Sequence, residues 1–409
     1  MSLKSFFENN FEEFSDEVIR EHLNDRQNGI SERYVEMLLN FIKEKLNLLT
    51  SKMQLDIFSN GTVYTGSAGL GLYYFMRYIR KNKPEDDVLK IVLEYLDLKS
   101  LKGRRISFLC GDAGPLALAT IVSYKLGTSR PANLPDYKAL AQRLLDLISL
   151  LKESPDELLY GGAGYLYALL FVNKYIRETD VIPSLPKHIE KVIASIIQSG
   201  KLFSAKSKSE SPLLWQWHEK IYLGAAHGVA GILYILLQAH SYINHQDMHT
   251  SIKPTLDWLA LQQFPSGNFP SSLGSSSGDR LVQWCHGAPG FVPLFLLAYQ
   301  IFKEEAYLKI ALQCGEVIWQ RGLCTKGYSI CHGVSGNAYS FLYLYQTTKD
   351  PLHLYRACRF MEWCVAEKAG TELHTPDRPA SLFEGLLGRL YLAEDIIRPD
   401  VAKFPAFTL

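Results

Sequence analysis

The sequence predicts an all-α protein built from a repeated pair of helices, and three observations lead to this fold class. Pairs of glycines spaced Gly-x-x-Gly recur along the chain at intervals of 45 to 67 residues. Several pairs run directly into apolar stretches with helical spacing, and no long stretch alternates with the period of a strand. An interval of about 50 residues is long enough for two helices and their connections.

The glycine pairs define the repeat. Seven copies occur, with glycines at 66/69, 111/114, 161/164, 228/231, 287/290, 333/336 and 385/388. Each pair lets the backbone turn sharply or pack closely where a helix begins. Because one such unit cannot bury its own apolar face, the repeats are expected to close into a single domain over residues 1–409.

Segments outside the glycine pairs add to the helical pattern. Residues 1–58 are expected to be a helical lead-in to the first repeat, with one apolar face made of Val35, Leu38, Leu39, Ile42, Leu46 and Leu49. The spacing also predicts helices over 307–319 and 352–365. Residues 264–279 are predicted to form a long irregular loop, and loops of this kind are often functional.

Composition and charge exclude several classes of protein. A hydrophobic content of 47% is enough for a core, and a net charge of +1 leaves no basic surface for nucleic acid. The seven cysteines form no compact framework, which favours free thiols in a reducing compartment. No stretch resembles a secretory signal or a transmembrane helix. We therefore expect a cytoplasmic protein, and the sequence leaves open a peripheral association with a membrane.

The position directly before each glycine pair carries the chemical signal. In chain order it holds Thr65, Cys110, Tyr160, His227, His286, His332 and Glu384. Three of the 11 histidines occupy this one position, and the position before it holds Cys285 and Cys331. If the repeats close into a ring, equivalent positions meet near one end of its axis, and these side chains gather in one pocket.

Two repeats share the pattern Cys-His-Gly-x-x-Gly and suggest a metal site. Cys285, Cys331 and His332 are candidate ligands of one zinc ion, with a fourth position left open as in catalytic sites. The alternative is that both cysteines are buried as small apolar residues. His227 is a candidate acid or base, or else a core histidine bonded to a carbonyl. Lys326, five residues before Cys331, can bind an anionic group or be a solvated loop lysine.

Several motifs resemble one known family. They read Trp-Cys-His-Gly-Ala-Pro-Gly at 284–290, Ile-Cys-His-Gly-Val-Ser-Gly at 330–336, Ser-Phe-Leu-Cys-Gly-Asp-Ala-Gly-Pro at 107–115 and Gly-Ala-Ala-His-Gly at 224–228. Together they resemble the lanthionine synthetase C family over nearly the whole chain, and within it the eukaryotic LanC-like proteins. The resemblance implies an α/α toroid, in which seven outer helices surround seven inner ones.

The resemblance also implies roles for individual residues. Zinc would be held by Cys285, Cys331 and His332, and His227 would be the active-site histidine. Glu157 stands four residues before a glycine pair, where bacterial cyclases of the family have a catalytic aspartate. The implied glutathione contacts are Lys326, His374, Thr375, Pro376 and Asp377, with His374 in the place of an arginine in close relatives.

The activity implied by the resemblance is transfer of glutathione. One zinc ion per chain would activate the thiol of the co-substrate glutathione, and the acceptors would be dehydroalanine or dehydrobutyrine residues in proteins or peptides. One alternative is a signalling adaptor that binds glutathione or a peptide without turnover. A zinc prenyltransferase would be expected to have a carboxylate ligand. A glycosidase needs two opposed carboxyl groups, and the repeated position offers only Glu384.

Overall fold

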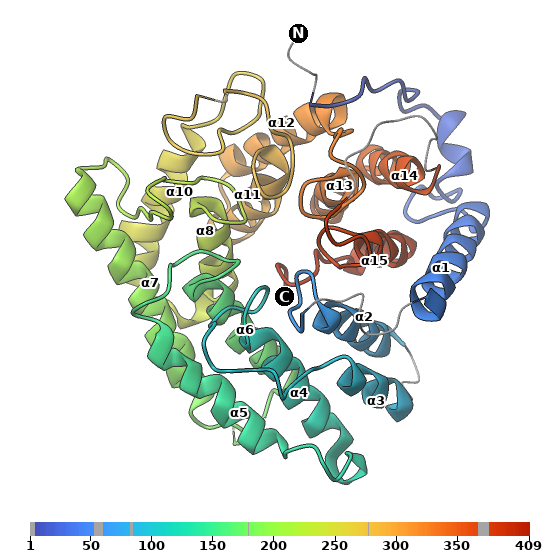
Figure 1. Ribbon diagram of the computed structural model, residues 1–409. Coiled ribbons are helices and arrows are strands. Elements are labelled where there is room, and N and C mark those ends of the chain that lie inside the picture. Colours follow the sequence, from blue (N-terminus) through green and yellow to red (C-terminus); the bar gives the residue numbers. More distant parts are fainter. Residues whose placement is uncertain (1–4, 53–59, 82–84, 179, 277, 367–375) are drawn as a thin grey trace. The chain divides into compact units, whose positions relative to one another are not determined.

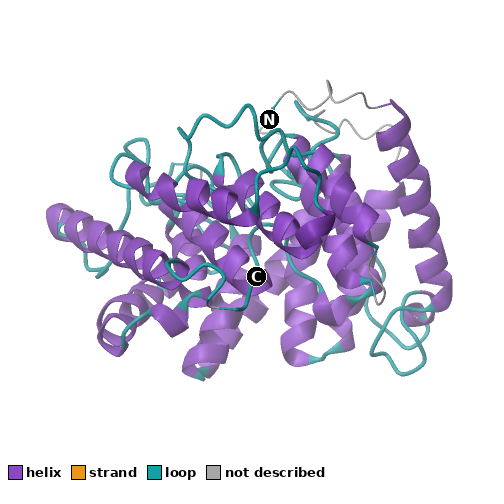
Figure 2. Ribbon diagram, turned by 90° about the horizontal axis from the view of Figure 1, so that it is seen from below, coloured by secondary structure: helices purple, strands orange, loops and turns teal. Residues whose placement is uncertain are grey.

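The computed structural model describes residues 5–52, 60–81, 85–178, 180–276, 278–366 and 376–409 (Figure 1). Figure 2 shows these residues as helices joined by loops. Their extended pairing consists of isolated bridges, which include Phe6–Cys324, Leu23–Ile30 and Trp217–Lys220. The chain forms two compact units. Unit 1 comprises Met1–Ile57, Leu223–Ala226 and Ala260–Pro405, and unit 2 comprises Phe58–Tyr222, His227–Leu259 and Ala406–Leu409. The single domain expected from the sequence stays a prediction.

Each glycine pair begins a helix, as the sequence predicts. In unit 2 these helices are α2 (Ser67–Arg80), α4 (Ala113–Leu126), α6 (Gly162–Tyr175) and α8 (Val229–Gln238). In unit 1 they are α11 (Ala288–Phe302), α13 (Val334–Thr348) and α15 (Leu386–Ile397). Most of their residues are buried, which explains why their sequences are apolar around nearly the whole circumference.

The intervening helices bury one face only. They are α3 (Asp86–Glu94), α5 (Tyr137–Asp146), α7 (Leu185–Ser207), α10 (Lys253–Ala260), α12 (Glu305–Arg321) and α14 (Pro351–Ala366). In unit 2, α3, α5 and α7 pack on α2, α4 and α6; in unit 1, α12 and α14 pack on α11 and α13. The helices predicted at 307–319 and 352–365 are therefore confirmed.

Short turns of helix fill several connections. They are η1 (Val18–Glu21), η3 (Gly127–Ser129), η4 (Leu147–Leu150), η5 (His240–Tyr242), α9 (His245–Asp247), the π-helical η6 (Met248–Ile252) and η7 (Pro399–Val401). Within the described residues, no helix has the length and apolar character needed to span a bilayer.

The predicted lead-in helix is α1 (Glu32–Lys52), which packs on α15. Its predicted apolar face is partly wrong, because Leu39 is 53% exposed. Two residues outside the predicted face are buried: Tyr34, one turn before Leu38, and Phe41, directly before Ile42. The error has a simple cause, since a leucine next to an apolar stripe in sequence lies about 100° away from it around the helix.

Hydrogen bonds tie the N-terminal part of unit 1 to α14. The hydroxyl of Tyr34 donates to the carbonyl of Cys358 at 2.7 Å, and that of Tyr355 donates to the carbonyl of Glu12 at 2.6 Å. The ring of His22 lies 2.8 Å from a carboxylate oxygen of Glu362. These contacts join segments more than 300 residues apart in the sequence.

Close packing explains the glycine pairs better than unusual backbone angles do. A Cβ atom on Gly114, Gly164 or Gly336 would lie 2.0–2.2 Å from the carbonyl oxygen of the residue six positions earlier. The loop before each helix therefore passes directly over the helix start. Among the seven first glycines, all of which the structure describes, Gly287 has a left-handed φ, of 111°.

Replacement of Gly114 by alanine is expected to lower the free energy of unfolding by about 1–3 kcal/mol, since the backbone carbonyl of Phe108 must move away from the new Cβ. Gly61→Ala is the matched control, because the nearest atom to a Cβ there is 3.6 Å away, and its effect should stay within about 0.5 kcal/mol. Urea titration followed by circular dichroism measures both. Equal effects of the two substitutions would contradict the packing explanation.

Candidate metal centre and histidine–glutamate pair

Backbone hydrogen bonds bring equivalent positions of successive repeats together. The residues concerned stand two positions before the first glycine of each pair. The backbone N–H of such a residue donates to the backbone carbonyl of the equivalent residue in the next repeat. In unit 2 Tyr64 donates to Leu109 at 3.0 Å; in unit 1 Cys285 donates to Cys331 at 3.2 Å and Cys331 to Phe383 at 3.0 Å. Within each unit the repeat register therefore places side chains of equivalent positions side by side.

This register assembles in unit 1 a cluster of side-chain atoms that could hold a metal ion. One ligand atom each from Cys285, Cys331 and His332 lies within 4.8 Å of the other two. The two cysteines are buried and the histidine is half-buried. Tetrahedral zinc, with bonds of about 2.3 Å to sulfur and about 2.0 Å to nitrogen, separates its ligands by about 3.3–3.8 Å. The observed spacing fits such a site, and within the described residues no carboxylate belongs to the cluster.

The surroundings of Cys285 differ from those of an ordinary buried cysteine. Its pKa is lowered, chiefly by a hydrogen bond from Cys331, against the opposing effect of burial. The charge of Lys326 and the amide of Gln283, whose Nε2 lies 3.2 Å from the sulfur, lower it further. By contrast, burial raises the pKa of Cys364 to about 11. The environment of Cys285 thus favours the thiolate that a metal ligand requires.

A histidine–glutamate pair lies in unit 2. Nδ1 of His227 is 2.7 Å from Oε2 of Glu157, and the side chain of Glu157 is only 2% exposed. The same carboxylate accepts the backbone N–H groups of Leu159 at 3.0 Å and Tyr160 at 2.6 Å. With its carboxylate held by two backbone donors, Glu157 fixes the orientation of the imidazole of His227.

The position of Glu157 in its repeat is informative. In two other repeats a serine stands four residues before the first glycine of the pair. The hydroxyl of Ser329 accepts the N–H of His332, and that of Ser381 accepts the N–H of Glu384, each at 3.3 Å. Glu157 accepts the corresponding N–H of Tyr160. A hydroxyl is sufficient for that turn, so the longer carboxylate side chain is explained by its additional contact with His227.

A strained hairpin covers the imidazole. The ring of Trp217 stacks on that of His227, with centroids 4.1 Å apart and planes 16° from parallel. Trp217 and Lys220 exchange two backbone hydrogen bonds around His218 and Glu219, whose φ angles are 46° and 60°. Left-handed residues other than glycine cost roughly 1–2 kcal/mol each. The role of Trp217 could not be predicted from the sequence, because the chain has no Asn-Gly or similar turn signal there.

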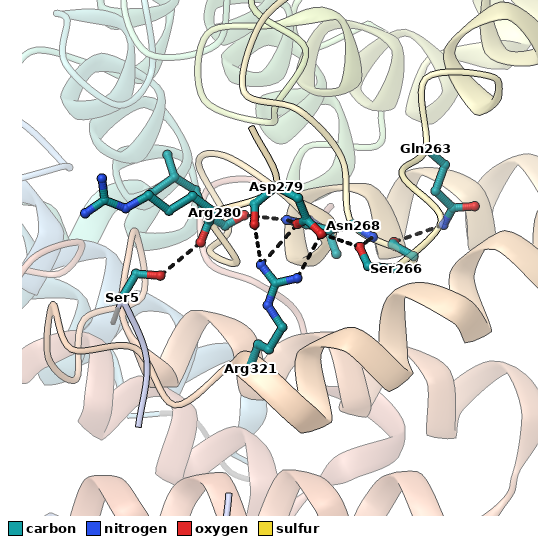
Figure 3. A network of polar contacts seen from close by, with 10 residues as sticks. Ser5, Gln263, Ser266, Asn268, Asp279, Arg280 and Arg321 are labelled. Carbon is teal, nitrogen blue, oxygen red and sulfur yellow. Dashed lines mark hydrogen bonds and ion pairs between the residues drawn. The ribbon is translucent and has the colours of Figure 1, made fainter. Parts of the chain in front are cut away.

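The predicted irregular loop at 264–279 is confirmed in its described residues and closes around the segment that bears Cys285. The side chain of Asn268 donates to the carbonyl of Leu281 at 3.0 Å and accepts the N–H of Ala288 at 2.8 Å. It also donates to Asp279 at 2.7 Å. Figure 3 shows this network around Asp279. None of these roles could be read from the sequence.

The predicted glutathione contacts are only partly described. Lys326 is exposed on the connection between α12 and α13, where the N–H of Thr325 donates to the carbonyl of Ser5 at 3.2 Å. Pro376 is half-buried and Asp377 is exposed. His374 and Thr375 lie outside the described residues. The roles of all four predicted contacts from 374 to 377, and that of Lys326, stay predictions.

Asp156, next to Glu157, should make stability depend on pH. Burial raises the pKa of Asp156 to about 6, although Ser199 donates a hydrogen bond to it at 2.6 Å. A raised carboxyl pKa means that the unfolded chain ionises first, so stability falls as pH rises from about 4 to about 6. The free energy of unfolding of Asp156→Asn, measured relative to that of the wild type, should therefore be about 2–3 kcal/mol higher at pH 7 than at pH 4. Urea titrations of both proteins at pH 4 and pH 7 measure this free energy. If variant and wild type differ by the same amount at both pH values, the prediction is wrong.

Comparison with known proteins places the chain among its relatives. The family model described as lanthionine synthetase C-like protein matches residues 58–409. A Danio rerio protein named glutathione S-transferase LANCL1 is 38% identical over all of both chains. An Arabidopsis thaliana protein named LanC-like protein GCL1 is 34% identical, covering 85% of this chain and 81% of its own. The structure of nisin cyclase matches with a TM-score of 0.61 and 16% identity, over 89% of this chain and 94% of the other. This likeness confirms the predicted fold class, an all-α α/α toroid.

Proposed function

Since the chain belongs to the lanthionine synthetase C-like family, we propose that it is a zinc-dependent transferase for glutathione. Its acceptors are dehydroalanine and dehydrobutyrine residues in proteins or peptides. The observation that carries the proposal is the cluster of Cys285, Cys331 and His332. The name of the Danio rerio relative, a glutathione S-transferase at 38% identity, supports glutathione as the thiol.

The donor set favours zinc among the common metal ions. Two thiolates and an imidazole suit zinc, whereas calcium and magnesium require oxygen ligands. Cys285, Cys331 and His332 would hold the ion and leave one position for a substrate. When bound there, zinc lowers the pKa of a coordinated thiol and so supplies a thiolate nucleophile at neutral pH.

The reaction forms one carbon–sulfur bond, and the proton that leaves the glutathione thiol is balanced by one added to the α-carbon of the acceptor. The thiolate sulfur of glutathione attacks the β-carbon of the dehydroamino acid, and the electrons of the carbon–carbon double bond move towards the carbonyl oxygen. The resulting enolate then takes a proton at the α-carbon. We assign this transfer to His227: with Nδ1 directed at Glu157 at 2.7 Å, Nε2 takes up the proton released by the glutathione thiol and delivers it to the α-carbon. Trp217, stacked on the ring, limits its rotation.

Lys326 and the segment 374–377 are proposed to bind glutathione. Glutathione carries two carboxylates, and an exposed ammonium group whose charge reaches Cys285 is suited to hold one of them near the metal. His374, Thr375, Pro376 and Asp377 are proposed as the second contact. Histidine at 374 lacks the permanent charge and the two-pronged geometry of arginine, so more of the binding energy should depend on Lys326.

Lys326→Ala is expected to raise the KM for glutathione by about 10–100-fold, which corresponds to the roughly 1.5–3 kcal/mol of a hydrogen bond to a charged group. The zinc content should not change, because Lys326 is not a proposed ligand. Steady-state kinetics with glutathione varied measures the effect. Lys349→Ala, which removes a lysine paired with Asp400 on the surface, is the control. An unchanged KM would make Lys326 a solvated loop residue.

The proposed function is tested by mass spectrometry of a dehydroalanine peptide incubated with the purified protein, Zn²⁺ and glutathione. The expected product is heavier than the peptide by one glutathione, and it forms faster than in the absence of protein. A zinc-loaded protein that binds glutathione without accelerating the addition would contradict the transferase and favour the adaptor.

A further inference from the structure

We infer that Asn268, Asp279 and Arg321 form a positioning network for the metal centre, although none of them touches the proposed ligand atoms. This inference rests on the metal site of the proposed function but does not depend on glutathione transfer. Asn268 and Asp279 belong to the loop before α11, and Arg321 is the last residue of α12. All three lie in unit 1.

The first link is between Asn268 and the segment that bears Cys285. Asn268 is fully buried, and its amide bridges the carbonyl of Leu281 and the N–H of Ala288. These two residues bracket Cys285 on either side, and Ala288 is the first residue of α11. One side chain therefore holds both ends of the segment. Gly287 leaves room for it, because a Cβ there would lie 2.9 Å from the amide oxygen.

The second link fixes the amide of Asn268. Its Nδ2 donates to Asp279 at 2.7 Å as well as to Leu281, so its oxygen must face the N–H of Ala288. Ser266 donates to the other carboxylate oxygen of Asp279 at 2.6 Å. An amide with the opposite orientation would place a donor against the N–H of Ala288, and the carboxylate of Asp279 excludes that arrangement.

The third link reaches the loop that carries the other two ligands. The guanidinium of Arg321 makes two parallel bonds of 3.0 Å to the carboxylate of Asp279 and a third, of 2.7 Å, to its carbonyl (Figure 3). Arg321 directly precedes the connection that leads to Cys331 and His332. Buried Asn337 of α13 joins the same two loops, since it donates to the carbonyls of Val282 at 2.9 Å and Gly322 at 2.8 Å.

The network therefore sets the spacing of the donors before a metal ion binds. Without it, the loop with Cys285 and the loop with Cys331 would have to be ordered against each other when the ion binds, and that ordering would weaken affinity. The ion pair differs from an ordinary surface pair, because the side chains of Arg321 and Asp279 are only 17% and 29% exposed and their geometry is bidentate.

The test measures the affinity of the full chain for Zn²⁺ by competition with a chelator. Arg321→Gln and Asp279→Asn should each weaken it by about 10–100-fold, the usual effect of losing an outer-shell partner. The double variant should be about as weak as either single one, because both substitutions break the same link. Lys349→Gln and Asp400→Asn, which break an exposed lysine–aspartate pair in unit 1, should leave the affinity unchanged.

Affinities of both variants within twofold of the wild type would overturn the inference. If Asp279→Asn fails to fold, Arg321→Lys keeps the charge but loses the two-pronged contact, and it should still weaken binding. Wild-type protein that binds no Zn²⁺ would overturn the network together with the metal site. Wild-type protein that binds Zn²⁺ tightly but transfers no glutathione would refute only the proposed function.

Discussion

Cys331→Ala is expected to lose the bound zinc and, with it, transfer of glutathione. The cluster offers three donors, so this substitution leaves Cys285 and His332 as the remaining pair. Loss of a direct ligand should weaken zinc binding by more than the roughly 10–100-fold typical of an outer-shell partner. Elemental analysis of the untagged protein should fall from about one zinc per chain to well below one.

A second buried cysteine provides the control for this experiment. Cys314 lies on α12, and burial raises the pKa of its thiol well above the usual range. Cys314→Ala removes a thiol of the same unit and should keep zinc and activity, apart from a loss of stability due to the cavity. Full zinc content in a Cys285→Ala, Cys331→Ala double variant would contradict the metal assignment.

His227→Ala is expected to lower kcat by about 10²–10⁴-fold with little change in the KM for glutathione, since a proton donor acts in the transition state. Zinc should be retained, because His227 is not a proposed ligand. Steady-state kinetics and elemental analysis of the same preparation measure both quantities. Loss of zinc in this variant would instead make His227 a fourth ligand and leave no open position.

Two further substitutions separate this role from a structural one. Glu157→Gln should also lower kcat, because a neutral amide facing Nδ1 would not stabilise the positive charge that the imidazole carries while it holds the transferred proton at Nε2. His240→Ala removes an exposed histidine of the same unit and should have no effect on kcat. If Glu157→Gln keeps full activity, the carboxylate serves only the turn that it forms with the N–H of Tyr160.

The fold could be predicted well because its signals are local and repeated. A glycine in such close contact with backbone atoms cannot be replaced without a shift of the backbone, and glycine therefore recurs at the helix starts, as at Gly114 and Gly336. The register of the repeats also predicted the metal cluster, since Cys285 and Cys331 hold equivalent positions that a backbone hydrogen bond joins. The period predicted the paired helices, the residue types at equivalent positions predicted the candidate metal cluster, and the resemblance to the family implied the closed toroid.

The supporting residues could not be predicted because their partners are distant and differ from repeat to repeat. Asp279 meets Arg321 across 42 residues, and Trp217 covers His227 from a hairpin without the usual turn residues. Glu157, which the resemblance to the family had already indicated, also left a signal within the repeat itself. It stands where other repeats have a serine, and that departure from the repeat marks a residue with an additional role.

The packing of α1 on α15 has a consequence for synthesis of the protein. The two helices are separated by more than 300 residues, and unit 1 is assembled from segments on both sides of unit 2. At translation rates of about 5–20 residues per second, α15 is synthesised roughly 15–70 s after α1. During that time the apolar face of α1, with Leu38 and Ile42, is exposed in the nascent chain. Unit 2 includes Ala406–Leu409 as well, so neither unit can be completed during synthesis until the residues that follow α15 have been made.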